Sequence, residues 1–158
     1  GEVGAIVDAG GTVKNDVWNP IIGSSVGAIT RGNDVIYLAG TFLNSIGNPG
    51  TPAVKAVNLS GAPLEFNAPI PADYLVRSMA VTNTRIVVGA TSVSGSKPTA
   101  AFAYDTSGNL LTTWNLTGNN STSVTLAADR VNNKVYVAGD FSYVGNTFQP
   151  FFAELKLP

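Results

Sequence analysis

The chain has 158 residues, and its hydrophobic fraction of 44% excludes a disordered tail, because disordered segments lack the apolar surface that offsets the entropy of ordering a chain. Its net charge of −1, with only 12% charged residues, offers no basic field to nucleic acid or to an anionic membrane surface, and no apolar run is long enough to span a membrane. Histidine and cysteine are absent, which excludes Ser-His-Asp and Cys-His catalysis, zinc-finger sites and disulfides.

The N-terminal residues carry the first copy of a pattern that returns twice along the chain. An apolar run at 5–7 is followed by a turn with Gly10 and Gly11 and then by the pair Trp18-Asn19. The next two aromatic–Asn pairs follow at intervals of 48 residues, as Phe66-Asn67 and Trp114-Asn115. Several landmarks that keep one period indicate an internal repeat.

The other half of each period contains short segments rich in Val, Ile and Tyr, which predict strands rather than helices. Corresponding segments lie at 36–40, 86–90 and 135–139, each after a turn that contains Asn. Asp105 and Gly108 predict a tight turn, in which Asp accepts backbone N–H groups and Gly takes a positive φ. The last repeat predicts four strands, at 110–115, 123–128, 134–139 and 150–156.

Four antiparallel strands repeated every 47–51 residues are typical of a β-propeller, so we predict an all-β fold made of propeller blades. Small residues at Ala39-Gly40 and Ala138-Gly139 are expected on the crowded innermost strands. A β-sandwich is the alternative if the period is coincidental. The expected units are the end of one blade at 1–19, blades at 20–67 and 68–115, and a blade without its last strand at 116–158.

The sequence predicts about three blades. A closed propeller ring has at least four, so these blades cannot close a ring alone. We therefore expect further blades, in the same or another chain, to complete the ring. A fragment of a longer chain is the favoured interpretation, and association between copies is the alternative. Open sheet edges and apolar blade faces would promote either kind of contact.

The third repeat carries a family resemblance. It reads Gly139-Asp140-Phe141-Ser142 after an apolar strand, then a small loop with Gly145 and a strand with Ala153. This pattern resembles the bacterial propeller repeats called delta-60 repeats, in which Gly-Gly-Asp-Phe-Thr follows an apolar strand. The first repeat keeps Gly40-Thr41-Phe42 without the Asp, and the second lacks both the Asp and the Phe. The resemblance implies a propeller in secreted or cell-surface proteins, mostly of unknown function, and brings no catalytic residues.

Three loops follow the strands that end in small residues, at 41–51, 91–97 and 140–149, and we expect them on one face of the disc. Structural roles are the alternatives to ligand binding. Phe42 and Phe141 would then be buried between blades, and Asp140 would cap a turn. The residues predict no catalytic group, metal site or cofactor. The candidate binding residues are Phe42, Tyr143 and Phe148, whose rings suit a sugar or peptide, and Asp140, whose carboxylate suits a cation.

These features favour a non-enzymatic β-propeller module, secreted or on the cell surface, that acts as a scaffold or binds a protein or glycan through one disc face. A neutral surface rich in Ser, Thr, Asn and Gly is common on extracellular β proteins. Two alternatives stay open. One is a fragment of a propeller enzyme that acts on polysaccharide with its catalytic residues elsewhere. The other is a structural subunit of a surface filament or layer, which exposed sheet edges would favour. Nucleic acid and a membrane span are not expected.

Overall fold

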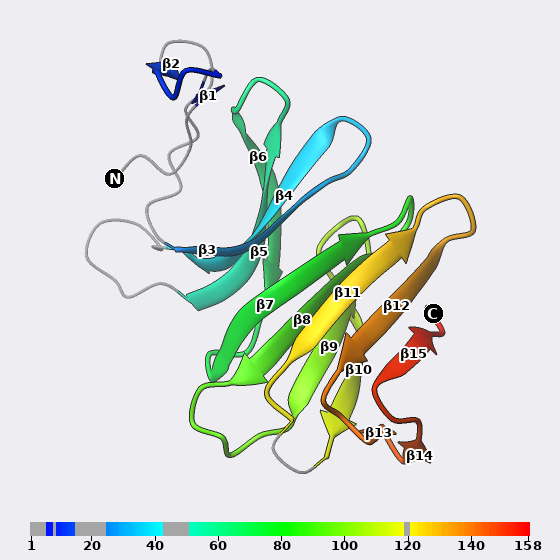
Figure 1. The fold of residues 1–158 in the computed structure, drawn as a ribbon. Coiled ribbons are helices and arrows are strands. Elements are labelled where there is room, and N and C mark those ends of the chain that lie inside the picture. The colour runs from blue at the N-terminus through cyan, green and yellow to red at the C-terminus, as the bar shows by residue number, and fades with distance from the viewer. Residues whose placement is uncertain (1–5, 8, 15–24, 43–50, 119–120) are drawn as a thin grey trace.

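The computed structural model describes residues 6–7, 9–14, 25–42, 51–118 and 121–158, and in these residues the chain forms strands and turns without a helix. The all-β fold class is therefore confirmed. A short N-terminal hairpin pairs β1 (Ile6–Val7) with β2 (Val13–Lys14). Three larger antiparallel sheets follow along the chain (Figure 1).

The first and second sheets each contain four strands in chain order. The first sheet is formed by β3 (Val26–Arg31), β4 (Val35–Phe42), β5 (Thr51–Asn58) and β6 (Pro63–Pro69). The second sheet is formed by β7 (Tyr74–Val81), β8 (Ile86–Ser92), β9 (Thr99–Tyr104) and β10 (Leu110–Thr117). Each strand pairs antiparallel with the next strand along the chain.

The third sheet has three strands, β11 (Val124–Asp129), β12 (Lys134–Gly139) and β15 (Phe152–Leu155), in that order. Between β12 and β15 the chain leaves this sheet and forms a small hairpin, β13 (Tyr143–Val144) and β14 (Thr147–Phe148). That hairpin pairs with β10 and extends the second sheet to six strands. The four predicted strands of the last repeat correspond to β10, β11, β12 and β15, whereas this hairpin was not predicted.

The internal repeat extends to the register of the strands. At or near its end, the second strand of each sheet has a small residue that pairs with a valine of the first strand, as Val26↔Gly40, Val76↔Ala90 and Val124↔Gly139. A β-bulge follows this valine in the first and second sheets. The same sequence landmarks therefore occupy the same places in three separate sheets.

The turns between the third and fourth strands are also equivalent. The Asp105 side chain accepts hydrogen bonds from the backbone N–H groups of Ser107 and Asn109, and Gly108 has a φ of 88°. Asn58 accepts in the same way, and Gly61 has a φ of 86°. The predicted Asp-to-Gly turn is confirmed, because its side-chain oxygen replaces backbone acceptors and glycine tolerates the left-handed conformation.

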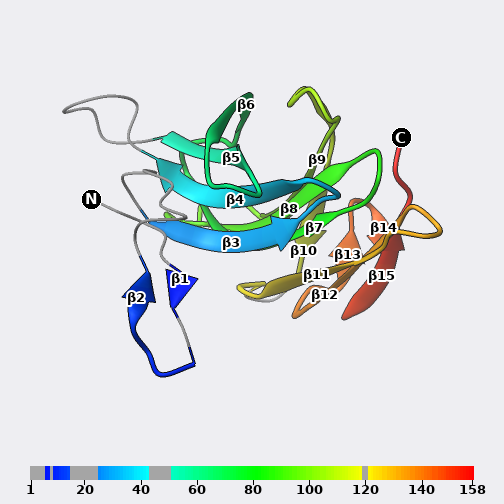
Figure 2. The same cartoon turned by 90° about the horizontal axis from the view of Figure 1, so that it is seen from above.

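The three sheets stack in series, and the second sheet lies between the other two (Figure 2). One core joins the first and second sheets and includes Val54, Phe102 and Tyr104. Another core joins the second and third sheets and includes Leu116 and Phe141. The first strands β3, β7 and β11 are neighbours. This arrangement differs from a β-sandwich, in which only two sheets share one core.

Close approach of the backbone explains the small residues Gly40, near the end of β4, and Gly139, at the end of β12. A Cβ atom on Gly40 would collide with the carbonyl oxygen of Ser25, and one on Gly139 would collide with that of Ser123. Both glycines lie on the second strand of their sheets, whereas it is the first strands that neighbour one another. The crowding at both glycines comes from the segment that enters the first strand, and their place on the innermost strands of a propeller stays a prediction.

Candidate functional site

The hairpin β13–β14 is held firmly against the second sheet. Its pairing with β10 is Leu116↔Val144 and Thr117↔Tyr143. Two backbone hydrogen bonds extend it, from Ser142 N–H to Thr117 C=O (2.7 Å) and from Gly145 N–H to Asn115 C=O (2.8 Å). Phe141, immediately before the hairpin, is fully buried between the second and third sheets. The expected alternative, a buried structural role for Phe141, is therefore confirmed. This core side chain positions the loop at 140–149.

Tyr143 and Phe148 form an exposed aromatic pair on this hairpin. Their rings pack edge to face with centroids 5.4 Å apart, and the side chains are 43% and 65% exposed. The pairing Tyr143↔Phe148 places both on the same side of the hairpin. The two predicted binding residues are thus brought together, in a geometry that favours aromatic contact and leaves ring surface free for a ligand.

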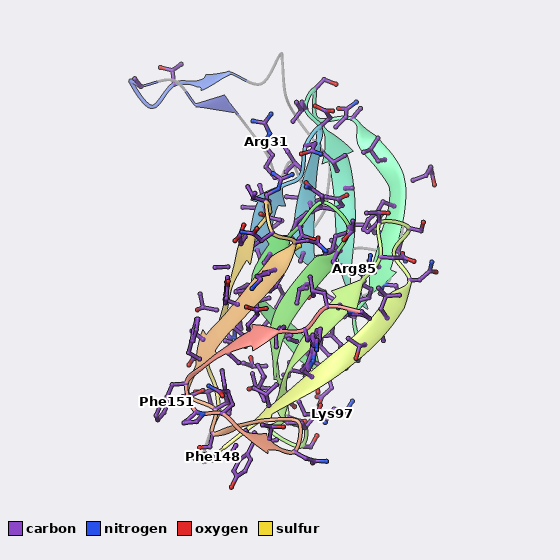
Figure 3. All side chains as sticks on the ribbon, turned by 90° about the vertical axis from the view of Figure 1, so that its right-hand side faces the viewer. Arg31, Arg85, Lys97, Phe148 and Phe151 are labelled. Atoms are coloured by element: carbon purple, nitrogen blue, oxygen red, sulfur yellow. The ribbon has the colours of Figure 1, made fainter. Side chains whose placement is uncertain are left out.

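Three further aromatic residues lie on or beside β15. Phe151 is 64% exposed and Phe152 is 55% exposed. Phe152 stacks on Tyr136 of β12, with centroids 5.8 Å apart and an angle of 10° between the rings. Phe148 and Phe151 project from the same end of the molecule (Figure 3). We call the five residues together the aromatic surface: Tyr136, Tyr143, Phe148, Phe151 and Phe152.

A groove of about 450 Å³ runs between the hairpin and β15. Trp114 and Val144 contribute apolar surface to it, and both are half-buried against the core between the second and third sheets. Thr147 and Gln149 line it from the hairpin side. The residues of β15 and its C-terminal neighbour also line it, from Phe152 to Lys156. Of the aromatic surface, Phe152 lines the groove, whereas Tyr143 and Phe148 lie on the other face of the hairpin from Val144 and Thr147.

Asp140 caps the segment that enters β11. Its carboxylate accepts hydrogen bonds from the backbone N–H groups of Thr122 and Ser123, at 2.9 Å each, and from the Thr122 hydroxyl. Partial burial alone would raise the pKa of Asp140, but these hydrogen bonds outweigh it and lower the pKa to about 2. These hydrogen bonds show that Asp140 caps this segment, which was the expected alternative to ligand binding.

A second, polar pocket of about 470 Å³ lies beside the loop that follows β8. Arg77 and Lys97 line it together with several hydroxyl groups, and Arg77 Nε donates to Thr91 Oγ1 at 2.9 Å. Next to this loop, the Asp73 carboxylate accepts from the hydroxyls of Ser92 and Ser94, which lower its pKa. Arg77 and Asp73 are thus hydrogen-bonded to neighbouring hydroxyl groups, and the pocket ranks behind the aromatic surface as a ligand site.

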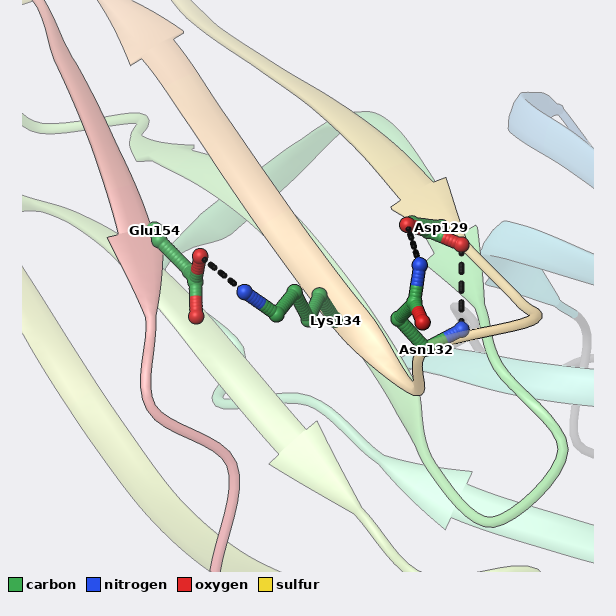
Figure 4. A network of polar contacts seen from close by, with 4 residues as sticks. All are labelled: Asp129, Asn132, Lys134 and Glu154. Carbon is green, nitrogen blue, oxygen red and sulfur yellow. Dashed lines mark hydrogen bonds and ion pairs between the residues drawn. The ribbon is translucent and has the colours of Figure 1, made fainter.

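The outer face of the third sheet has a polar rim (Figure 4). Lys134 Nζ and Glu154 Oε2 form an ion pair at 2.9 Å across β12 and β15. At the turn before β12, Asp129 accepts from the backbone N–H and side-chain amide of Asn132. Asn133 follows in the left-handed conformation with a φ of 55°, and the predicted turn with Asn before this strand is confirmed.

Sequence reasoning found part of this site. Phe42 ends β4, and its side chain lies outside the described residues. Tyr136, Phe151, Phe152 and the groove over Trp114 were missed. A signal was available, because Phe152 occupies the position of Ala101 in the repeat and thus puts a large ring where a neighbouring sheet would require a small residue.

Comparisons with models of known protein families and with curated proteins give no match to this chain. Among the described residues, no three acidic, His or Cys side chains cluster as metal ligands would. None of the described segments is a helix long and apolar enough to cross a membrane.

Proposed function

We propose that the protein is a non-enzymatic binding module, secreted or on the cell surface, whose aromatic surface holds a protein or glycan ligand. The observation that carries this proposal is the set of exposed aromatic rings on the hairpin and on β15, beside a groove that Phe152 lines. Exposed aromatic residues are costly to leave in water and are common in recognition surfaces, since rigid rings bury large areas at little entropic cost.

The three sheets are, in this proposal, consecutive blades of a β-propeller of the delta-60 repeat type. Support comes from the shared register of the sheets, from their stacking in series and from the adjacency of their first strands. Electron microscopy of the native protein tests it: a closed ring of four or more sheets is expected, and a discrete three-sheet particle would contradict it.

Ligand binding is tested with a panel of oligosaccharides and extended peptides, measured by titration calorimetry. We expect at least one class of ligand to bind, and the double variant Tyr143→Ala/Phe148→Ala to bind it about tenfold more weakly. Val131→Ala is the matched control, because Val131 is 92% exposed on a turn outside the groove. Binding that is equal in both variants, or absent from the whole panel, would contradict the proposal.

A further inference from the structure

The face of the hairpin that carries Tyr143 and Phe148 continues onto β10 as a strip of uncharged polar side chains. Directly opposed residues of antiparallel strands project to the same side of a sheet, so the pairing Thr117↔Tyr143 puts the Thr117 side chain beside the Tyr143 ring. Side chains alternate along a strand, so Asn115 projects to this side as well, away from the buried Leu116. We propose that this face binds an uncharged saccharide, an inference that rests on the proposed binding function and specifies its ligand.

The aromatic pair supplies the apolar part of this face. Thr117, Tyr143 and Phe148 form a row across β10, β13 and β14. Neighbouring strands lie about 4.8 Å apart, so the row spans about 10 Å, a length on the scale of a disaccharide. A pyranose ring has C–H groups on its faces and hydroxyl groups around its rim. The exposed surfaces of the Tyr143 and Phe148 rings suit the C–H faces, because flat apolar rings can stack on them.

Asn115 and Thr117 supply the hydrogen-bonding groups that the rim of a sugar requires. A side-chain amide has both donors and an acceptor, and a hydroxyl can donate and accept. Within the described part of the chain, neither the Asn115 amide nor the Thr117 hydroxyl forms a hydrogen bond. Opposite Asn115 lies Gly145, and a Cβ atom there would meet no atom within 4 Å beyond its chain neighbours. The exposed Asn115 amide is therefore open to a ligand that lies against the aromatic pair.

The same residues favour a saccharide over other ligands. None of the four side chains on this face is charged, so an uncharged sugar suits it better than an acidic one: Asn115, Thr117, Tyr143 and Phe148. An extended peptide draws its affinity mainly from backbone hydrogen bonds to the edge of a sheet, whereas the groups here are side chains that project from a face. Rings that adjoin an amide and a hydroxyl match the C–H faces and the hydroxyl rim of one sugar ligand.

The test is titration calorimetry of the full chain with cellohexaose, xylohexaose and chitohexaose, and with trigalacturonate as the charged comparison. We expect at least one uncharged oligosaccharide to bind, and Asn115→Ala to weaken that binding about tenfold through lost hydrogen bonds. Asn67→Ala is the matched control, because Asn67 is exposed and follows Phe66 in β6 as Asn115 follows Trp114 in β10. Absence of binding, equal weakening by both variants, or tighter binding of trigalacturonate would overturn the proposal.

A conservative change at Phe148 separates ring stacking from general apolar contact. Phe148→Leu keeps an apolar side chain but removes the flat ring, so we expect it to weaken saccharide binding about tenfold. Phe148 is 65% exposed, so the variant should keep the thermal unfolding temperature of the wild type. Unchanged saccharide binding in Phe148→Leu would contradict the inferred stacking.

An attached saccharide is distinguished from a bound one by peptide mapping of the native protein. Asn115-Leu116-Thr117 matches the acceptor pattern for N-linked glycosylation. We expect Asn115 to be unmodified. A glycan on Asn115 would mean that the aromatic pair covers an attached saccharide, and the inferred ligand would be wrong.

The outcomes separate this inference from the proposed function. If a peptide binds, no saccharide does, and Tyr143→Ala/Phe148→Ala abolishes peptide binding, the saccharide is wrong and the binding module stands. If neither class of ligand binds, both proposals fail.

Discussion

The second and third sheets have the same strand register but differ in what covers them. Both faces of the second sheet are buried, one against each neighbouring sheet. The third sheet buries one face, and its other face carries the half-exposed Phe152 and the ion pair of Glu154. The positions that correspond across the two sheets are Val87, Gly89, Ala101 and Ala103 in the second and Tyr136, Ala138, Phe152 and Glu154 in the third.

This difference shows that backbone pattern and surface role are separable. Small side chains at Gly89 and Ala101 let the third sheet pack closely on the second. Large rings and charges at the corresponding positions of the third sheet would hold another sheet further away, but they suit a partner that contacts aromatic rings. Substitutions that affect the buried contacts but not the exposed outer face of the third sheet, or the reverse, can test this difference.

The largest effect is expected for the buried aromatic residue of the shared core. Phe141→Ala should lower the free energy of unfolding by about 3–5 kcal/mol, because Phe141 is fully buried and the truncation leaves a cavity. Phe152→Ala should cost about 1 kcal/mol or less, because that ring is 55% exposed. Urea denaturation of both variants measures the contrast, and equal losses would show that the outer face is covered in solution.

The next effect concerns the close approach of backbone segments. Gly139→Ala should cost about 1–3 kcal/mol, because its Cβ would collide with the carbonyl oxygen of Ser123. Gly89→Ala should cost less, because its nearest atoms belong to the side chains of Ser78 and Val124, which can move more readily than backbone. Thermal unfolding compares the two variants. A larger loss for Gly89→Ala would show that packing between sheets is more rigid than the backbone contact.

A smaller effect is expected for the cap at Asp140. Asp140→Ala should lower stability by about 1–2 kcal/mol at neutral pH, because it removes several hydrogen bonds from a partly solvated carboxylate. The pKa of Asp140 is lowered to about 2 from an ordinary value near 3.9, so the stabilisation is complete above about pH 4 and is lost as the pH falls through about 2. Urea titrations at pH 6 and pH 2 should give a difference between wild type and variant that is much smaller at the lower pH. A constant difference would mean that the cap does not depend on the carboxylate charge.

The smallest effect belongs to the ion pair on the outer face. Lys134→Met should change stability by no more than the uncertainty of a urea titration, because Lys134 and Glu154 are both largely exposed and solvent screens their attraction. Wild type and variant are compared at low and high salt. A clear loss of stability at low salt would indicate that the outer face is less solvated than its exposure suggests.

Much of the fold follows from local sequence. The strands of the last repeat, the Asp105 to Gly108 turn and the turn at Asn133 were predictable, because β-branched runs and turn residues act through their immediate neighbours. The candidate site was only partly predictable. Tyr143 and Phe148 could be named, but their mutual packing and the proximity of Phe152 depend on a hairpin that pairs with another sheet.

The sequence by itself determined the repeat and the positions of the strands β10, β11, β12 and β15. Only the tertiary structure decided which faces are covered, why Gly40 and Gly139 are small and where the aromatic rings gather. The physical reason is the range of the interactions. Strand and turn preferences arise between residues a few positions apart, whereas β13 pairs with β10 and β15 borders Trp114 through contacts about 30–40 residues apart along the chain, which no local pattern specifies.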